Sequence, residues 1–179
     1  MSEITCRPCG PKDLNAMMAL QEKVCAALEN KELYVASDAE RNGYILEKQG
    51  VIGAFCGERL VGYCSFIYPG TKESDYARHL GWDETLQPRC GAVDSAVVDP
   101  EFRGQGLQKR MARLAVEEMR KKSPDGILLT TISPYNPASL RSMQAVGFAI
   151  LHQKKMYGGK DRCILAMALN GKPLPEVRV

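Results

Sequence analysis

The stretch Ala92–Gln108 constrains the fold of this chain more than any other part of the sequence. Its first half, Ala92–Val98, is short and apolar, which is typical of a buried strand. A turn containing Gly104 and Gly106 follows. From Leu107 onward, apolar residues recur with a period of about 3.6 residues, which predicts an amphipathic helix. The sequence therefore predicts a buried strand, a glycine turn and a helix in direct succession.

A glycine turn between a strand and a helix is well suited to binding phosphate groups. The first amides of a helix have no partner within the helix and lie at the positive end of its dipole. Glycine at positions 104 and 106 removes the Cβ atoms that would keep a pyrophosphate away from these amides. We therefore expect a phosphate-bearing ligand here. The alternative is an ordinary strand-to-helix connection in which the glycines serve only the turn.

Two common phosphate-binding motifs do not fit the turn. The dinucleotide motif G-x-G-x-x-G needs a third glycine where this chain has Lys109, and the Gly-Lys-Ser/Thr of a Walker loop does not occur. The remaining pattern, Arg103-x-x-Gly106-x-Gln108, resembles the acyl-CoA signature of the GNAT acyltransferases, Gln/Arg-x-x-Gly-x-Gly/Ala. Gln108 departs from that signature, because the family has a small residue there. Its side chain is expected either to point away from the pyrophosphate or to contact it.

A second segment resembles the same family. Asn136-x-x-Ser139, a helix and then Gly147-Phe148 are similar to the family's Asn-x-x-Ala segment, helix and Gly-Phe pair. The resemblance implies that Asn136 and Ser139 contact the pantetheine or phosphate arm of CoA. The alternative for Asn136 is a helix N-cap, with Pro137 at the first helical position. Two motifs in the family's order and spacing support the resemblance better than either motif alone.

The resemblance implies an N-acetyltransferase that moves an acetyl group from acetyl-CoA, its cosubstrate, to an amine by direct attack, without a metal. The strand Ala92–Val98 would splay from its neighbour and pair with pantetheine, and an amide near Val98 would face the thioester oxygen. The residues assigned to acetyl-CoA are Ala96, Val97, Val98, Arg103, Gly104, Gln105, Gly106, Leu107, Gln108, Asn136 and Ser139.

A base is needed to remove a proton from the ammonium form of the acceptor, and Asp94 is the candidate. It lies two residues before Ala96, and therefore on the same face of a regular strand. Burial of a carboxylate within an apolar strand is costly unless the group is partnered or functional. The alternative is that Asp94 binds loop amides or a neighbouring hydroxyl and only shapes the site.

The general acid is where the sequence departs from the family. Met143 stands where the family has a tyrosine, and methionine has no proton to donate. Tyr135, Tyr157, Ser142 or a water would replace it, unless the thiolate leaves unassisted. The alternative function is a catalytically weak GNAT-fold protein that binds or senses acyl-CoA, and a nucleotide-binding module is a third possibility.

The acceptor is not identified by the sequence, which leaves small-molecule and peptide amines open. The connection Pro69–Arg89 carries Tyr76, His79 and Trp82. We expect these side chains either to form the wall of an acceptor pocket or to pack the connection onto the core. One or two helical turns are expected around Ser74–Leu80.

The length of 179 residues suits one domain, which we place at residues 1–169, with a loose proline-rich tail at 170–179. The order of elements predicts an α/β (α+β) fold of the GNAT kind, with a mixed, mostly antiparallel sheet, helices on both faces and a splayed central strand pair. Expected strands are Ile4–Arg7, Val51–Cys56, Leu60–Tyr68, Ala92–Val98, Ile127–Ile132, Phe148–Gln153 and Arg162–Ala168. Expected helices are Pro11–Leu28, one from Asp38 to Gly50, one from Leu107 to Lys122, and one from Asn136 to Gly147.

Composition argues against several classes of partner. The net charge of +3 is mild and the basic residues are not gathered as in a nucleic-acid binder. The apolar runs are too short to span a bilayer. Seven cysteines without a disulfide framework, and an N-terminus without a signal sequence, favour the cytoplasm. The resemblance, which is to bacterial-type enzymes, also allows a homodimer.

Overall fold

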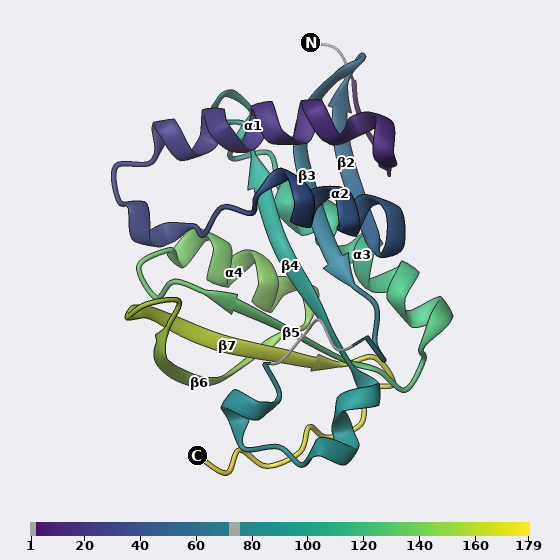
Figure 1. Ribbon diagram of the computed structural model, residues 1–179, viewed down its shortest axis with the longest axis vertical. Helices are drawn as coiled ribbons and strands as arrows, with labels where there is room; N and C mark the ends of the chain where they lie inside the picture. The colour runs from purple at the N-terminus through teal and green to yellow at the C-terminus, as the bar shows by residue number, and fades with distance from the viewer. Residues whose placement is uncertain (1–2, 72–75) are drawn as a thin grey trace.

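Seven strands form one sheet in the order β1-β2-β3-β4-β5-β7-β6 (Figure 1), in a computed structural model that describes residues 3–71 and 76–179. Neighbouring strands are antiparallel except β4 and β5, which run parallel. The mixed, mostly antiparallel sheet predicted from the sequence is confirmed. The strands are β1 (Ile4–Pro8), β2 (Gly50–Cys56), β3 (Arg59–Ile67), β4 (Cys90–Val98), β5 (Ile127–Ile132), β6 (Ala149–Met156) and β7 (Lys160–Ala168).

Helices cover both faces of the sheet, as predicted (Figure 1). They are α1 (Leu14–Ala27), α2 (Ala39–Lys48), α3 (Leu107–Lys122) and α4 (Pro137–Val146). The apolar sides of α1 and α2 pack on one face of β2, β3 and β4. α3 and α4 pack on the opposite face. Within residues 3–71 and 76–179, none of the helices combines the length and the apolar character needed to span a membrane.

The predicted splayed strand pair is formed by β4 and β5. These strands pair only between Cys90 and Ala92 on β4 and between Ile127 and Leu129 on β5. Beyond this point β4 continues to Val98, and in the described part of the chain no strand pairs with the edge that it turns toward β5. The separation leaves backbone groups of β4 free to bind a ligand.

A bulge interrupts β4 at Asp94. On one side of the bulge Ser95 pairs with Ser65 of β3, and on the other side Val93 pairs with Phe66. Asp94 is therefore the extra residue on its strand, which breaks the regular alternation of side chains.

The bulge changes the face on which Asp94 lies. Ala92 and Val97 both pack beneath α1 and α2, although an odd number of positions separates them. Ala96 pairs with Cys64, which packs beneath α3 on the other face. Asp94 instead forms an ion pair with Arg41 of α2. The prediction that Asp94 shares a face with Ala96 is therefore wrong, because it assumed a regular strand.

The segment before β4 and the C-terminal residues cover the outer face of β5 and β7. Leu174 and Val177 pack into an apolar cluster there, and the amide of Arg178 donates a hydrogen bond to the carbonyl of Leu80 at 2.9 Å. The prediction of a loose tail is wrong, because these apolar residues have a surface to pack on. Of the helical turns predicted at 74–80, Arg78–Leu80 is a 3-10 turn, and residues 74 and 75 lie outside the described residues.

The last two strands are longer than predicted. β6 continues to Met156 and β7 begins at Lys160, so only a short turn joins them in place of the predicted connection from Lys154 to Asp161. The end of β6 is rich in lysine because β6 is an edge strand that faces solvent. Because these residues are charged, the apolar pattern did not predict this part of the strand.

Candidate active site

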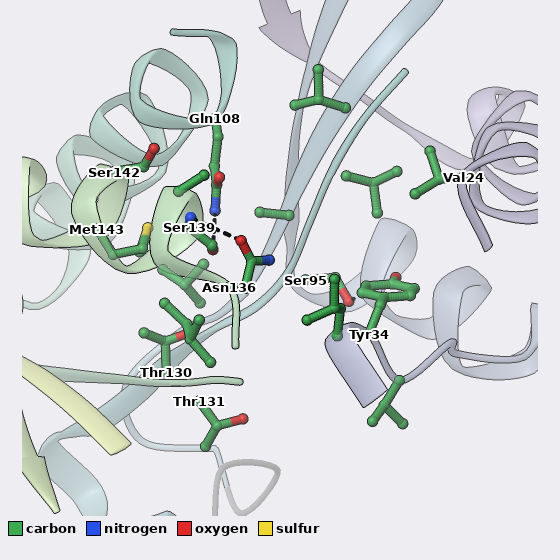
Figure 2. A pocket seen from close by; sticks show the side chains of 18 of the residues that line it. Val24, Tyr34, Ser95, Gln108, Thr130, Thr131, Asn136, Ser139, Ser142 and Met143 are labelled. Atoms are coloured by element: carbon green, nitrogen blue, oxygen red, sulfur yellow. Dashed lines mark hydrogen bonds between the residues drawn. The ribbon is translucent and has the colours of Figure 1, made fainter. Parts of the chain in front are cut away.

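A cavity of about 560 Å³ lies where β4 and β5 separate (Figure 2). The sequence-predicted site residues that line it are Tyr76, Asp94, Ala96, Val97, Val98, Arg103, Gly104, Gly106, Leu107, Gln108, Asn136 and Ser139. The three that do not line it are Gln105, His79 and Trp82. The fold thus brings both family-like motifs and the bulged strand to one cavity.

The glycine turn at one end of the cavity suits a pyrophosphate. Gly104 and Gly106 have φ angles of +77° and +70°, and a Cβ atom at either position would have no heavy atom within 4 Å. Neighbouring side chains therefore do not explain the two glycines. The first turn of α3 is closed by the Arg110 amide, which donates to the Gly106 carbonyl at 3.0 Å. The amides of Leu107 and Gln108, which precede it, have no partner within the helix and lie beside this open space.

Gln108 joins the two motifs. Its Nε2 donates a 2.7 Å hydrogen bond to Ser139 Oγ at the start of α4, as Figure 2 shows. Asn136 caps α4, because its Oδ1 accepts a 3.1 Å hydrogen bond from the Ser139 amide. The side chain at 108 thus points toward α4, and the N-cap alternative for Asn136 is also confirmed.

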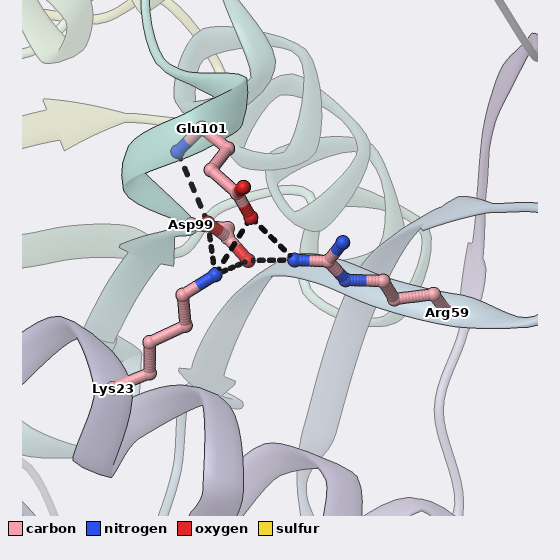
Figure 3. Close-up of polar contacts among 4 residues, drawn as sticks. All are labelled: Lys23, Arg59, Asp99 and Glu101. Carbon is pink, nitrogen blue, oxygen red and sulfur yellow. Dashed lines mark hydrogen bonds and ion pairs between the residues drawn. The ribbon is translucent and has the colours of Figure 1, made fainter.

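A cluster of four charges supports the segment before the glycine turn (Figure 3). Asp99 is 1% exposed and contacts Lys23 Nζ at 2.9 Å and Arg59 Nη2 at 2.7 Å. Glu101 contacts the same two cations, each at 2.8 Å. Burial alone raises the pKa of Asp99, but hydrogen bonds from Lys23, the Glu101 amide and Arg59 outweigh burial and hold that pKa below its ordinary value. The cluster ties α1 and β3 to the end of β4.

Asp94 lies at the cavity wall with its side chain 14% exposed. Its Oδ1 is 3.2 Å from Arg41 Nη2. Burial raises the pKa of Tyr34 and of Tyr76, and the negative charge of Asp94 adds to both shifts. Asp94 is thus a partnered carboxylate whose charge acts on Tyr34 and Tyr76.

The candidate proton donors separate by position. Ser142 and Tyr157 line the cavity, whereas Tyr135 does not and donates a hydrogen bond to Asp161 at 3.1 Å. Met143 both lines the cavity and packs in the core, where it is 1% exposed. Figure 2 shows Ser142 and Met143 on α4, with Ser139 of the same helix nearby.

The three residues expected at the acceptor pocket, Tyr76, His79 and Trp82, also differ in whether they line the cavity. The hydroxyl of Tyr76 accepts a hydrogen bond from Tyr157 at 3.1 Å at the cavity wall. Trp82 is 6% exposed and packs into the cluster on β5 and β7. His79 is half-buried outside the cavity lining. For Trp82, the structure shows the alternative in which the connection folds onto the core.

Sequence reasoning missed several polar residues of the cavity, among them Tyr34 and Arg162. Tyr34, after the first helix, lies 3.2 Å from Ser95 Oγ and 3.0 Å from Gln21 Oε1 through its hydroxyl. Arg162, on β7, lines the cavity and is only 3% exposed. A cation at the start of an apolar strand was the available signal for Arg162, whereas no local pattern marked Tyr34.

Comparison with solved structures agrees with the fold. An acetyltransferase of the GNAT family from Streptococcus pneumoniae superposes with a TM-score of 0.71 at 17% identity, over 93% of this chain and 99% of that chain. A protein from Salmonella typhimurium, in a structure with its cofactor acetyl-CoA, gives 0.68 at 20% identity over 99% of this chain and 100% of its own. A ribosomal-protein-alanine N-acetyltransferase from Brucella melitensis gives 0.66 at 22% identity over 92% and 99%. At these low identities, the TM-scores show the fold alone.

Family membership comes from the sequence itself. No curated protein matches the chain. The model of the acetyltransferase (GNAT) family, however, matches residues 17–148, a span that contains most of α1, the β2–β3 hairpin, the bulged β4, the glycine turn and α4. The chain therefore belongs to the GNAT family of acetyltransferases.

Proposed function

We propose that this protein is an N-acetyltransferase that moves the acetyl group of acetyl-CoA to the amine of an acceptor held in the same cavity. The observation that carries the proposal is the convergence of an unpaired β4 edge and an open glycine turn on one cavity. A ligand with a pyrophosphate and an extended amide-containing arm is complementary to both. Acetyl-CoA has this form.

In the proposed complex, each end of the cavity has a distinct role. The amides after Gly106 bind the pyrophosphate, and Arg103 adds a positive charge beside it. The free edge of β4 at 96–98 binds the pantetheine arm as a further strand would. Asn136 and Ser139 flank the arm from the start of α4.

The chemistry requires a neutral amine at the thioester. Asp94, directly or through a water, takes the ammonium proton. The neutral amine nitrogen then forms a bond to the thioester carbon and loses its second proton to water, the bond from that carbon to sulfur breaks, and the thiolate leaves and takes up a proton. A backbone amide near Val98 stabilises the charge that develops on the carbonyl oxygen. Ser142 and Tyr157, which line the cavity, are the side chains proposed to return the proton.

A second candidate function is acyl-CoA binding without efficient turnover. It is favoured by Met143, which fills the core at a position where the family resemblance implies a tyrosine acid. The cytoplasmic location expected from the sequence, and the boundary between a domain at residues 1–169 and a C-terminal segment at 170–179, stay predictions.

An assay of CoA release, combined with binding measurements, distinguishes the two functions. Purified protein is incubated with acetyl-CoA and a panel of small and peptide amines, and free CoA is followed spectrophotometrically. The proposed function predicts CoA release that depends on a particular amine. Binding of acetyl-CoA in calorimetry without CoA release for any amine supports the binding protein. A thermal shift with ATP or NAD but none with millimolar acetyl-CoA contradicts both.

A further inference from the structure

A buried arginine on β7 lines the cavity and has no carboxylate partner among the described residues. Arg162 is 3% exposed and lines the cavity. The arginine side chain stays ionised in proteins, and burial of a charge is costly unless an opposite charge or hydrogen bonds compensate it. The partners of Arg162 therefore indicate what this part of the cavity is built to hold.

Only some of the N–H donors of Arg162 form hydrogen bonds within the protein. Its Nη1 donates to the Asp161 carbonyl at 2.7 Å and its Nη2 to the Glu32 carbonyl at 2.6 Å. A guanidinium has five N–H donors, so further donors remain. Within residues 3–71 and 76–179, no carboxylate forms an ion pair with Arg162.

The nearest acidic groups are already engaged. The Asp161 carboxylate contacts Lys155 Nζ at 3.1 Å and accepts a hydrogen bond from Tyr135. Asp94, on the bulged strand, forms its ion pair with Arg41. The charges of Asp161 and Arg162 interact without an ion-pair contact, so a direct carboxylate partner of Arg162 is left for a ligand to supply.

Tyr157, whose ring lies near Arg162, has a costly backbone conformation. Tyr157 is the one non-glycine residue with positive φ, at +51°, among the described residues, a conformation that persists where the surrounding structure enforces it. In this position the Arg162 guanidinium carbon lies 5.7 Å from the centre of the Tyr157 ring. The Tyr157 hydroxyl lies 2.9 Å from Thr131 Oγ1 and donates to Tyr76. Three hydroxyls thus line the cavity wall beside the cation.

We propose that Arg162 binds a carboxylate of the acceptor, and that the acceptor is a free amino acid whose amine is acetylated. A guanidinium binds a carboxylate through two parallel hydrogen bonds, which fix the orientation of the bound molecule. The cavity of about 560 Å³ also has to hold the arm of the donor, and the proposed acceptor carries its amine and its carboxylate on one small molecule. A peptide acceptor has an amide where a free amino acid has its α-carboxylate. The inference rests on the proposed function and names its substrate class.

The test compares acceptors that differ only in the carboxylate. Each proteinogenic L-amino acid is assayed beside its α-amide and its decarboxylated amine, with acetyl-CoA and the full chain. We expect kcat/KM for the best amino acid to exceed that for its amide by roughly 10- to 100-fold, the usual worth of a charged hydrogen-bonded pair. In Arg162→Gln the ratio of acid to amide falls toward one. A purely structural role of Arg162 would lower both rates and leave the ratio unchanged.

The control is Arg120→Gln, because Arg120 also donates to a backbone carbonyl, that of Leu169, but lies outside the cavity. This variant keeps the wild-type ratio. Arg162→Lys, which retains the charge, keeps part of the ratio and serves as the variant if Arg162→Gln does not fold. The ratio of kcat/KM for the amino acid to that for its amide, measured on the wild-type protein, tests the acceptor class without any variant.

The outcomes distinguish this inference from the proposed function. Equal rates on amino acids and their amides, or a preference for peptides with an acidic first residue, overturn the amino-acid acceptor while acetyl transfer stands. If none of the acceptors causes CoA release, the proposed function is overturned. In that case amino acids and amides are titrated into the CoA-loaded protein by calorimetry, and equal affinity for both overturns the role of Arg162.

Discussion

Gln108 at the start of α3 and Ser139 at the start of α4 are joined by a 2.7 Å hydrogen bond between Nε2 and Oγ. The bond links the two segments that resemble the family's CoA motifs, although 31 positions separate the two residues. It also explains how a long side chain is accommodated where the family signature has a small one, because the amide points toward α4.

We predict that Gln108 and Ser139 are energetically coupled. In Gln108→Ala and Ser139→Ala the free energy of unfolding falls, and the double variant loses less than the sum, with a coupling of about 0.5–1.5 kcal/mol for one hydrogen bond. Urea unfolding of the four proteins measures this. Gln105→Ala is the control, since Gln105 is exposed in the same turn. Additive losses would show that the bond has no influence on stability.

The glycine turn gives a prediction that separates ligand binding from backbone strain. Gly106→Ala places a side chain at φ +70°, which costs about 1–2 kcal/mol of stability. Gly171→Ala is the matched control, because Gly171 has φ +72°, equally open surroundings, and a place outside the cavity lining. We expect both variants to lose similar stability and only Gly106→Ala to lose affinity for acetyl-CoA in calorimetry. Equal affinities in the two variants would make the turn a simple connector.

The buried Asp99 predicts a pH dependence of stability. Its pKa is held below the ordinary carboxyl value in the folded protein, so its contribution is present above the unfolded pKa near 3.9 and is lost as the pH falls through the folded pKa. Asp99→Asn lowers the free energy of unfolding at pH 7 by about 1.5–3 kcal/mol, the range for hydrogen bonds to a charged group.

Asp99→Asn also weakens the loss of stability below about pH 4, where the wild-type carboxylate takes up its proton. Glu101→Gln is the control within the same cluster (Figure 3), and its effect is expected to be small because Glu101 is exposed to solvent. Denaturant unfolding at several pH values measures both variants. Identical acid limbs in wild type and Asp99→Asn would contradict the assignment.

Asp94 is predicted to act in turnover rather than in binding of the donor. In Asp94→Asn the rate on a proven acceptor falls by about 100-fold or more, the usual scale for acid–base catalysis, and the acid limb of the pH–rate profile changes. Affinity for acetyl-CoA stays near that of the wild type. Asp13→Asn is the control, because Asp13 is also a largely buried carboxylate paired with an arginine, Arg7, outside the cavity lining. Full turnover in Asp94→Asn would make Asp94 a structural residue.

The sequence predicted what local patterns encode. The strand, glycine turn and helix predicted from Ala92 to Lys122 follow from apolar periodicity and glycine positions, and the cap at Asn136 follows from Asn-Pro. The bulge at Asp94 was missed, because a bulge depends on pairing with β3 and leaves no local mark.

Contacts between distant parts of the chain could also not be predicted from local sequence patterns. Arg162 bonds to Glu32 across 130 positions, and the tail at Arg178 reaches Leu80. Both contacts depend on how the fold brings distant segments together. Arg162 lines the cavity and is held by such a contact, whereas the glycine turn is built from one continuous stretch.

The most direct test of acetyl transfer follows the acetyl group itself. Acetyl-CoA carrying a deuterated acetyl group is incubated with the protein and the amine panel, and products are analysed by mass spectrometry. The account predicts a labelled amide of one acceptor, formed in equal amount to the free CoA and absent without protein. Tight binding of acetyl-CoA with no labelled amide for any amine, or CoA release that is independent of amine, would contradict it.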